Sequence, residues 1–260
     1  MNTNKRFLVY TAIFGNYDTL KDPLKVSTVV DYICFTDSKD LKSNVWKIVH
    51  VDLSSSPSLL NRELKLLYPH REFFDYDYSL YVDGTILIKE DVAVFFEKYA
   101  GKYPVMNFKH PNNDCIFKEI INCIKLNKGN PEKLIQQYNI YLSEGMPKHW
   151  GLSDNKIILR DNHSELNKEM MEEWFEHVAN YSGRDQVCLA YVYYKHNYSF
   201  HFFEEDITDN LFFETWPHTS ASKFIWAWRN FKLFCEKHSL FLPLIKFLNK
   251  KVKPIVLKYV

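Results

Sequence analysis

The feature of this sequence that most limits its fold is the regular alternation of short apolar runs with amphipathic segments through the first 195 residues. The runs are rich in β-branched and aromatic residues, as in RFLVYTAI at 6–13, and turn residues follow them, which is typical of buried strands. Such alternation with short connections predicts an α/β domain with a mainly parallel central sheet flanked by helices. The expected strands are 6–13, 29–36, 45–51, 78–82, 86–88, 104–108 and 156–160.

The predicted helices lie between these strands and dominate the second half of the chain. Ser54-Ser55-Ser56-Pro57 is a helix start signal, and Leu60, Leu64 and Leu67 follow it at helical spacing. A second apolar stripe runs through residues 114–126. The expected helices begin near Pro57 and cover about 91–99, 114–126, 131–144, 164–179 and 185–194.

Composition places the chain among globular proteins and excludes several other classes. Hydrophobic residues make up 46% and charged residues 25% of 260 residues, so disorder and a coiled coil are excluded. No apolar run reaches the roughly 18 residues that span a bilayer, and residues 1–6 lack the apolar segment of a secretory signal. The five cysteines are odd in number and form no CxxC pair, which favours a reduced cytosol.

The net charge of +1 hides a basic C-terminal segment. Residues 223–260 hold nine Lys or Arg and one acid, a balance of +8, which leaves −7 on residues 1–222. Apolar side chains interleave with those cations, as in basic amphipathic helices that lie in a membrane interface. We therefore expect one globular domain at 1–222 and a helical tail at 223–260, broken near Pro243 and Pro254, that holds the protein on the inner face of the cytoplasmic membrane.

The basic C-terminal segment has two alternative interpretations. Its helices can pack on the body as an ordinary terminal pair with the lysines in water. Nucleic-acid binding is disfavoured because the body is acidic and no nucleic-acid-binding motif is present.

Ligands of α/β sheets bind beyond the carboxyl ends of the strands, which directs attention to residues 15–18, Asp37, Asp83-Gly84 and the segment after Phe108. Asp83 ends an apolar strand, where a carboxylate can hold a divalent ion or accept a ribose hydroxyl, while Gly84 permits close backbone approach. Alternatively, Asp83-Gly84 is an ordinary turn without a functional role.

Three further groups of residues can have either a functional or a purely structural role. Arg62 and Lys65 share a helix face and can meet phosphates, or they form a solvated face. His110 can bind metal or a substrate hydroxyl, or it is structural. Asp185 is either a helix cap or a carboxylate placed on the acceptor or the reacting sugar.

Six motifs in order resemble a known family. They are YTAIFGNYD at 10–18, DYICFTD at 31–37, YSLYVDG at 78–84, HPNNDCIFKE at 110–119, EGMPKHWGL at 144–152 and RDQ at 184–186. The chain resembles the glycosyltransferase-like family that includes plant mucilage-related and turgor-defect proteins, over about residues 6–195. This resemblance implies a GT-A-type nucleotide-sugar transferase fold, and bacterial members of the family tend to accompany capsule and lipopolysaccharide genes.

The resemblance also implies roles for individual residues. Thr11, Ala12, Gly15 and Tyr17 would line the nucleotide pocket, with the Tyr17 ring on uracil, and Asp37 would contact the base or ribose. Arg62 and Lys65 resemble the basic pair near the phosphates, and Asp185-Gln186 resembles the pair that faces donor sugar and acceptor. Asp83 corresponds to the first acid of the Asp-x-Asp metal motif. His110, Glu119, Glu144 and Arg184 lie in shared motifs without an assigned role.

The sequence departs from the metal motif at one position, because residue 85 is Thr. Manganese or magnesium can still bind through Asp83, a histidine and the diphosphate, with His110, His201 and His218 as candidates. Alternatively, Lys109, Arg160 or Arg184 neutralises the leaving diphosphate without metal. Either arrangement stabilises charge that develops on the leaving group.

The sequence thus predicts a membrane-associated glycosyltransferase that moves a sugar from a nucleotide sugar, such as a UDP-sugar, to a glycan or lipid-linked glycan. An inverting enzyme needs a base near the acceptor hydroxyl, for which Asp185 is the first candidate. A retaining enzyme needs none, and both remain open. The alternatives are a nucleotide-sugar or glycan-binding module without turnover and a hydrolase, against which the absence of Gly-x-Ser-x-Gly and His-Glu-x-x-His motifs argues.

Overall fold

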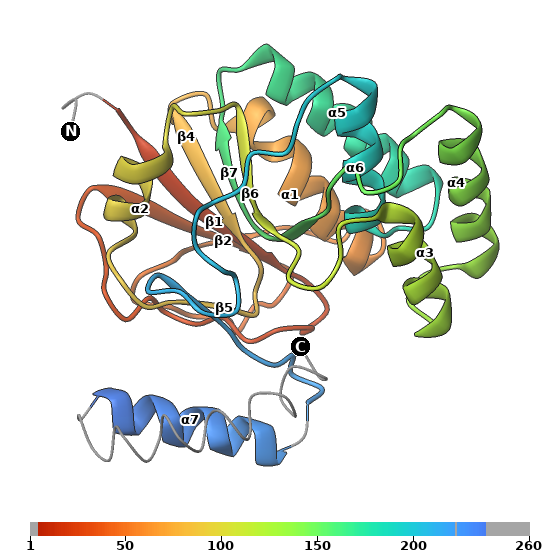
Figure 1. Cartoon of the computed structure of the whole chain (residues 1–260). Coiled ribbons are helices and arrows are strands. Elements are labelled where there is room, and N and C mark those ends of the chain that lie inside the picture. The colour runs from red at the N-terminus through yellow and green to blue at the C-terminus, as the bar shows by residue number, and fades with distance from the viewer. Residues whose placement is uncertain (1–4, 222, 238–260) are drawn as a thin grey trace.

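A six-stranded sheet forms the centre of the molecule (Figure 1). The computed structural model describes residues 5–221 and 223–237. The strands of this sheet follow the order β3-β2-β1-β4-β7-β6. They are β1 (Phe7–Ile13), β2 (Val30–Thr36), β3 (Lys47–His50), β4 (Tyr78–Val82), β6 (Val105–Lys109) and β7 (Ser153–Asp161).

One strand breaks the parallel arrangement. β1 pairs in parallel with β2 and β4, and β2 pairs in parallel with β3. β7 runs antiparallel to both of its neighbours, β4 and β6. The amino end of β7 therefore lies at the edge of the sheet where the other five strands have their carboxyl ends.

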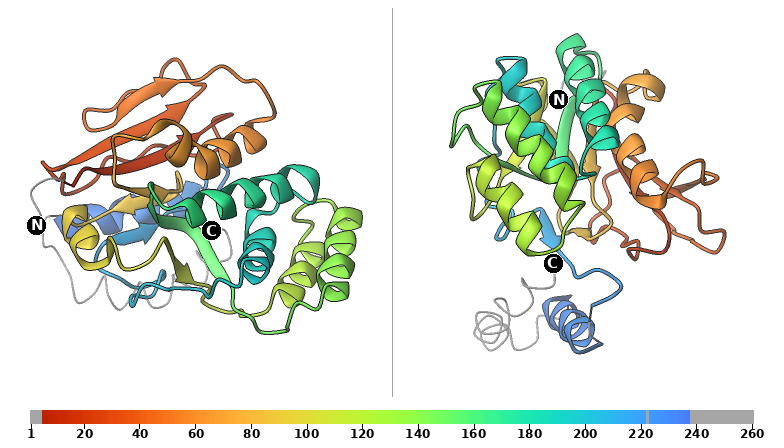
Figure 2. Two further views of the ribbon diagram at one scale, coloured as in Figure 1. Left: turned by 90° about the horizontal axis from the view of Figure 1, so that it is seen from above. Right: turned by 90° about the vertical axis from the view of Figure 1, so that its right-hand side faces the viewer.

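Helices cover both faces of the sheet (Figure 2). On one face α1 (Pro57–Glu72), α5 (Glu165–Asn180) and α6 (Asp185–Lys195) pack through residues such as Leu64, Trp174 and Leu189. On the other face α2 (Val92–Tyr99) contributes Phe95 and Phe96 to a second cluster. All seven residues of β1 are buried between these layers, which explains why its sequence is a continuous apolar run.

Two smaller units extend this core. The helices α3 (Ile116–Lys125) and α4 (Pro131–Ser143) pack on α6 through a third apolar cluster that includes Phe117, Leu134 and Tyr191. A two-stranded sheet pairs β5 (Ile86–Ile88) with β8 (Phe213–Thr215). This pairing brings the C-terminal part of the described chain next to the strand end at Asp83.

The last described helix, α7 (Lys223–Lys237), follows this small sheet (Figure 1). Arg229 bonds the Glu214 carboxylate and donates to the Thr215 carbonyl at 2.9 Å, and the Trp216 and Trp226 rings meet edge to face. The helix is therefore connected to the body through β8. The predicted breaks at Pro243 and Pro254 lie outside the described residues.

The predicted fold class is confirmed, with three local differences. The strand expected at 156–160 begins earlier, at Ser153, and is antiparallel. β8 was not predicted, because a three-residue strand between loops has no periodic signal. Asp185 is the first residue of α6, and the N-cap position belongs to Arg184, which makes no side-chain capping bond.

Candidate active site

A pocket of about 910 Å³ opens at the carboxyl edge of the strands. Its wall combines the turn after β1, the turn after β4, the residue that follows β6 and the amino ends of β7 and α6. Eleven of the predicted site residues line it. They are Ala12, Gly15, Tyr17, Arg62, Lys65, Asp83, Gly84, His110, Arg184, Asp185 and Gln186.

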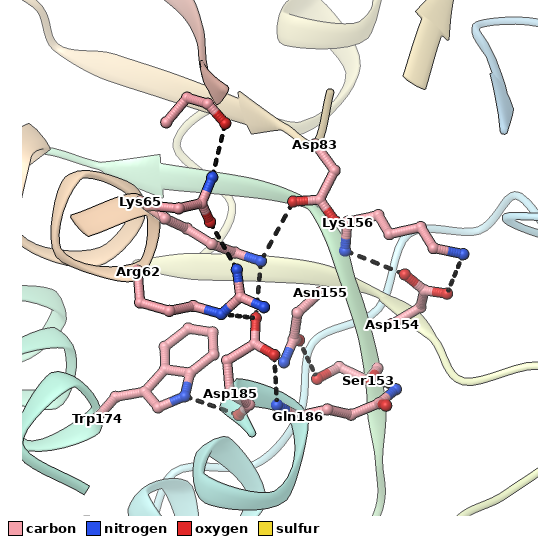
Figure 3. A network of polar contacts seen from close by, with 12 residues as sticks. Arg62, Lys65, Asp83, Ser153, Asp154, Asn155, Lys156, Trp174, Asp185 and Gln186 are labelled. Carbon is pink, nitrogen blue, oxygen red and sulfur yellow. Dashed lines mark hydrogen bonds and ion pairs between the residues drawn. The ribbon is translucent and has the colours of Figure 1, made fainter. Parts of the chain in front are cut away.

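Four charged side chains form a network in this pocket, in which Lys65 and Asp185 are buried and Arg62 and Asp83 are half-buried (Figure 3). Lys65 Nζ lies 2.9 Å from Asp185 Oδ2 and 3.6 Å from Asp83 Oδ1. Arg62 Nε lies 3.5 Å from the same Asp185 oxygen. Two cations of α1 therefore meet one carboxylate that directly follows β4 and one at the start of α6, which lie far apart in the sequence.

The two carboxylates of the network differ in their protonation behaviour. Burial alone would raise the pKa of Asp185, but the Arg62 and Lys65 cations outweigh it and hold that pKa well below the usual range of Asp. For Asp83 burial prevails over Lys65 and Arg62, so its pKa is raised. Asp185 is therefore a firmly ionised partner of the two cations, whereas Asp83 gives up its proton less readily.

Backbone contacts fix the position of Asp185 and Gln186. Trp174 Nε1 donates to the Asp185 carbonyl at 2.8 Å, and Asp185 Oδ1 accepts from the Gln186 N–H at 3.0 Å. The Gln186 side chain donates to the Ser153 carbonyl at 3.0 Å, which ties the start of α6 to the start of β7. The Asp-Gln pair is thus held at the pocket wall by its own helix and by a neighbouring strand.

The turn after β1 is built around a glycine with φ of +62°, a conformation that L side chains rarely adopt. The Gly15 N–H donates to both carboxylate oxygens of Asp37, at 3.0 and 3.2 Å. Asp37 is outside the pocket wall and holds this turn, so its contact with a base or ribose stays a prediction. Tyr17 is 63% exposed, and its ring centroid lies 4.7 Å from that of His218.

Gly84 allows two neighbouring turns to pack closely. A Cβ at this position would lie 2.7 Å from Asp18 Cβ, so the turns after β1 and β4 approach each other closely. Asp18 Oδ1 in turn lies 2.7 Å from His218 Nδ1. Glycine is therefore required by the neighbouring turn, whether or not a ligand also comes close.

Several candidates from the sequence lie away from the pocket. Thr11 is buried within β1, and His201 stacks on Tyr103 with 3.5 Å between ring centroids. Lys109 and Glu144 are also outside the pocket wall, and Glu144 accepts from Tyr191 at 2.5 Å and from Lys195 at 3.0 Å. Arg160 is fully buried in the core, so neutralisation of a diphosphate by Arg160 is incompatible with its position.

The structure adds pocket residues that the sequence analysis missed. They are chiefly Lys128, Asp154, Asn155 and Lys156. Three of these belong to the amino end of β7, and the antiparallel direction of this strand was not predicted. Ser153, Asp154 and Asn155 are polar residues in a buried strand, and only the structure reveals their burial because the expected strand began at residue 156. Such residues need a functional or hydrogen-bonding reason to be buried.

His110 and Glu119 share the wall near α3. The His110 N–H donates to the Leu152 carbonyl at 2.9 Å, and its Nδ1 accepts from the Asn112 N–H at 3.3 Å. Burial lowers the pKa of His110, opposed by the Glu119 and Asp154 charges. The imidazole is therefore neutral at pH 7.

The side chains can be tested as ligands for a divalent ion. Among the described residues, no three His, Cys, Asp or Glu side chains are grouped so that they could hold a metal. Asp83 faces Lys65, His218 is bonded to Asp18, and Thr85 is buried. The side chains therefore do not by themselves fit such an ion. Cations line the same pocket, namely Arg62, Lys65, Lys128, Lys156 and Arg184.

The sheet and its pocket define an α/β protein with a ligand site at the carboxyl edge of its strands. The family model described as TOD1/MUCI70, glycosyltransferase-like domain, matches residues 1–218. The chain belongs to this family, which confirms the resemblance carried by the six motifs and identifies the class of protein as a glycosyltransferase-like domain. The match ends near the expected boundary at residue 222, although the division into domains stays a prediction.

Comparison with individual proteins adds less. No curated protein matches the chain. Among solved structures it is similar to one titled WbbM bifunctional glycosyltransferase in its apo form, with 12% identity and a TM-score of 0.43. The match covers 76% of this chain and 39% of that one.

None of the helices that the structure describes is both long and apolar enough to cross a membrane.

Proposed function

We propose that this protein transfers a sugar from a nucleotide-sugar donor, such as a UDP-sugar, to a hydroxyl of a surface glycan. The observation that carries the proposal is the single pocket wall that joins the Gly15–Tyr17 turn, Asp83 and the Asp185 network. In an α/β sheet this edge binds the ligand, and 910 Å³ lies within the range of small-molecule sites. Membership of a glycosyltransferase-like family supports the same reaction class.

The nucleotide would lie over the turn after β1. The exposed Tyr17 ring at the pocket wall offers an aromatic face on which a base can stack. The donor sugar would then extend toward Asp185 and Gln186, which backbone contacts hold in place. Arg62 and Lys65 would contact its phosphates or hydroxyls from α1.

The leaving diphosphate needs positive charge beside it. Lys156 lies at the edge of the pocket next to the strand end of Asp83, whose N–H donates to the Lys156 carbonyl at 2.8 Å. Lys156 and Arg184 can therefore supply this charge from the protein. A manganese or magnesium ion held by Asp83 and the donor itself stays a prediction from the sequence, which the experiment below tests.

The acceptor proposal rests on the family resemblance and on charge. We infer a capsule or lipopolysaccharide glycan, free or lipid-linked, as the acceptor, and a cytoplasmic location at the membrane surface. The balance of +8 on residues 223–260 supports attraction to anionic lipid, at about 1 kcal/mol for each cation near the surface.

The experiment is a thermal-shift screen of the purified protein against nucleotides and nucleotide sugars, each with and without manganese. A ligand at 100 times its Kd adds about 2.7 kcal/mol, which raises the melting temperature measurably. A shift with one donor that needs manganese supports an ion at Asp83, and an equal shift without manganese supports neutralisation by side chains. No shift with any donor contradicts the proposal.

A second measurement separates transfer from mere binding. Nucleotide release from the bound donor is followed in the wild-type protein and in Asp83→Asn. Release that Asp83→Asn abolishes, with unfolding still cooperative, supports an enzyme. A donor that binds but releases no nucleotide in the presence of any glycan acceptor identifies a binding module.

A further inference from the structure

Five carboxylates from the described part of the chain line the pocket, and Glu119 differs from the other four in its contacts. Asp18 is paired with His218, Asp83 with Lys65, Asp154 with Lys156, and Asp185 with Lys65 and Arg62. For Glu119, the structure shows no Lys, Arg or His nitrogen within 4.0 Å among the residues that it describes.

Neutral groups hold Glu119 in place instead. It lies in the first turn of α3, where Oε2 accepts from Asn113 Nδ2 at 3.1 Å and Oε1 accepts from the Cys123 thiol at 3.7 Å. Asn113 is itself oriented, because its Oδ1 accepts from the Cys115 N–H at 3.2 Å. The carboxylate is thus positioned by two donors that carry no charge.

His110 supplies a complementary group on the same wall. Its Nδ1 accepts a backbone hydrogen bond, so in the neutral ring the proton lies on Nε2, which can donate to a substrate oxygen. Glu119 can only accept when ionised. A hydroxyl bound between them would find one donor and one acceptor.

We propose that Glu119 is the general base that takes the proton from the acceptor hydroxyl, and that transfer therefore inverts the anomeric centre. This inference rests on the proposed function and names the acceptor side of the same pocket. Asp185 then serves mainly to hold Lys65 and Arg62 on the donor side of the pocket, because its carboxylate is paired with both of these cations.

Transfer forms one bond to the anomeric carbon and breaks another. The acceptor oxygen forms a bond to the anomeric carbon while its proton moves to a Glu119 oxygen. The bond between the anomeric carbon and the diphosphate oxygen breaks, and its electron pair leaves with the nucleoside diphosphate. Glu119 later releases the proton to solvent. A base on the face opposite the leaving group gives inversion, as for inverting glycoside hydrolysis.

The test uses the donor that gives the largest shift in the thermal screen. Nucleotide release is measured with water and with a panel of p-nitrophenyl glycosides as acceptors, and proton NMR follows the anomeric configuration of the first product formed. We expect inversion in the wild-type protein. Glu119→Gln should lower the rate by about 10²–10⁴-fold, with the Kd for the donor unchanged.

Two further variants distinguish a base from a structural residue. In Glu119→Ala, added sodium formate should restore part of the rate, because a small carboxylate can occupy the space of the lost side chain. Glu132→Gln is the matched control, since Glu132 lies in the first turn of the adjacent α4 and is exposed outside the pocket. It should keep the wild-type rate.

The outcomes separate this inference from the function on which it rests. Retention of configuration, or a Glu119→Gln rate within about threefold of wild type, overturns Glu119 as the base while transfer itself stands. Failure of formate to raise the Glu119→Ala rate does the same. No donor bound, or a donor bound without nucleotide release to water or any glycoside, contradicts the proposed function itself.

Discussion

Arg160 donates through Nη2 to the backbone carbonyl of Lys65, at 2.6 Å. Pro69, four residues further along α1, has no N–H, so this carbonyl lacks its usual helical donor. The Tyr10 hydroxyl donates to the same oxygen at 2.6 Å. Two core side chains thus complete the turn of α1 that places Lys65 in the pocket.

We expect Arg160→Met to weaken both folding and donor binding. Loss of the guanidinium leaves the Leu66 carbonyl without one donor and the Lys65 carbonyl with Tyr10 alone. A hydrogen bond to a charged group contributes about 1.5–3 kcal/mol, and we expect a loss of this size in urea unfolding. Arg71→Met is the control, because Arg71 forms an exposed pair with Glu172 that is worth at most about 1 kcal/mol. Equal losses in the two variants would contradict this role of Arg160.

Asp185→Asn should destabilise the protein by about 3 kcal/mol at pH 7, because it breaks a buried pair with Lys65. The pKa of Asp185 is lowered in the folded state, so its stabilisation is complete above the ordinary Asp range and is lost only as the pH falls through the lowered value. The difference from wild type in urea unfolding should therefore be constant from pH 5 to 7. A difference that already shrinks across this range would show that Asp185 is not held ionised.

The same variant bears on catalysis. If Asp185 is itself the base, as the sequence suggests, Asp185→Asn lowers turnover by about 10²-fold or more with donor affinity kept. If it holds Lys65 and Arg62, donor affinity falls as well. Titration of the donor by thermal shift, together with initial rates, distinguishes these results.

Tyr17→Ala should weaken nucleotide binding by about tenfold or more, because base stacking on an aromatic ring is worth about 1–3 kcal/mol. The free energy of unfolding should change little, since the ring is 63% exposed. Phe74→Ala is matched to it, with an exposed fraction of 67% at a position outside the pocket. Isothermal titration with the donor and with the free nucleotide measures both variants. Equal affinities would remove Tyr17 from the nucleotide site.

Membrane association should depend on the basic C-terminal segment. Replacement of Lys246, Lys250, Lys251 and Lys253 by Gln should lower binding to phosphatidylglycerol vesicles by about 10²–10³-fold, with cosedimentation as the measurement. Four exposed body lysines, Lys39, Lys42, Lys47 and Lys125, provide a control of equal charge. The same loss in both variants would indicate nonspecific attraction and contradict a dedicated tail.

Much of the fold was predictable because its signals are local. The strand at 78–82 and the helix that begins at Pro57 follow from apolar spacing and a capping serine, whose side chain accepts from the Leu59 N–H. The position of the β7 strand was predicted from the sequence, but its antiparallel direction was not. Strand direction depends on which neighbours a strand pairs with, and neither β4 nor β6 is adjacent to it in the sequence.

The candidate site was likewise predictable only in part. The sequence alone determined that acidic and glycine turns would gather at the carboxyl edge of the sheet, because parallel strands end at a common edge. Only the tertiary structure decided the pairing of Lys65 with Asp185, the burial of Arg160 and the entry of the β7 amino end into the pocket. The strength and direction of a charge interaction depend on distance and burial, and chain folding sets these for residues such as Lys65 and Asp185, which lie 120 positions apart.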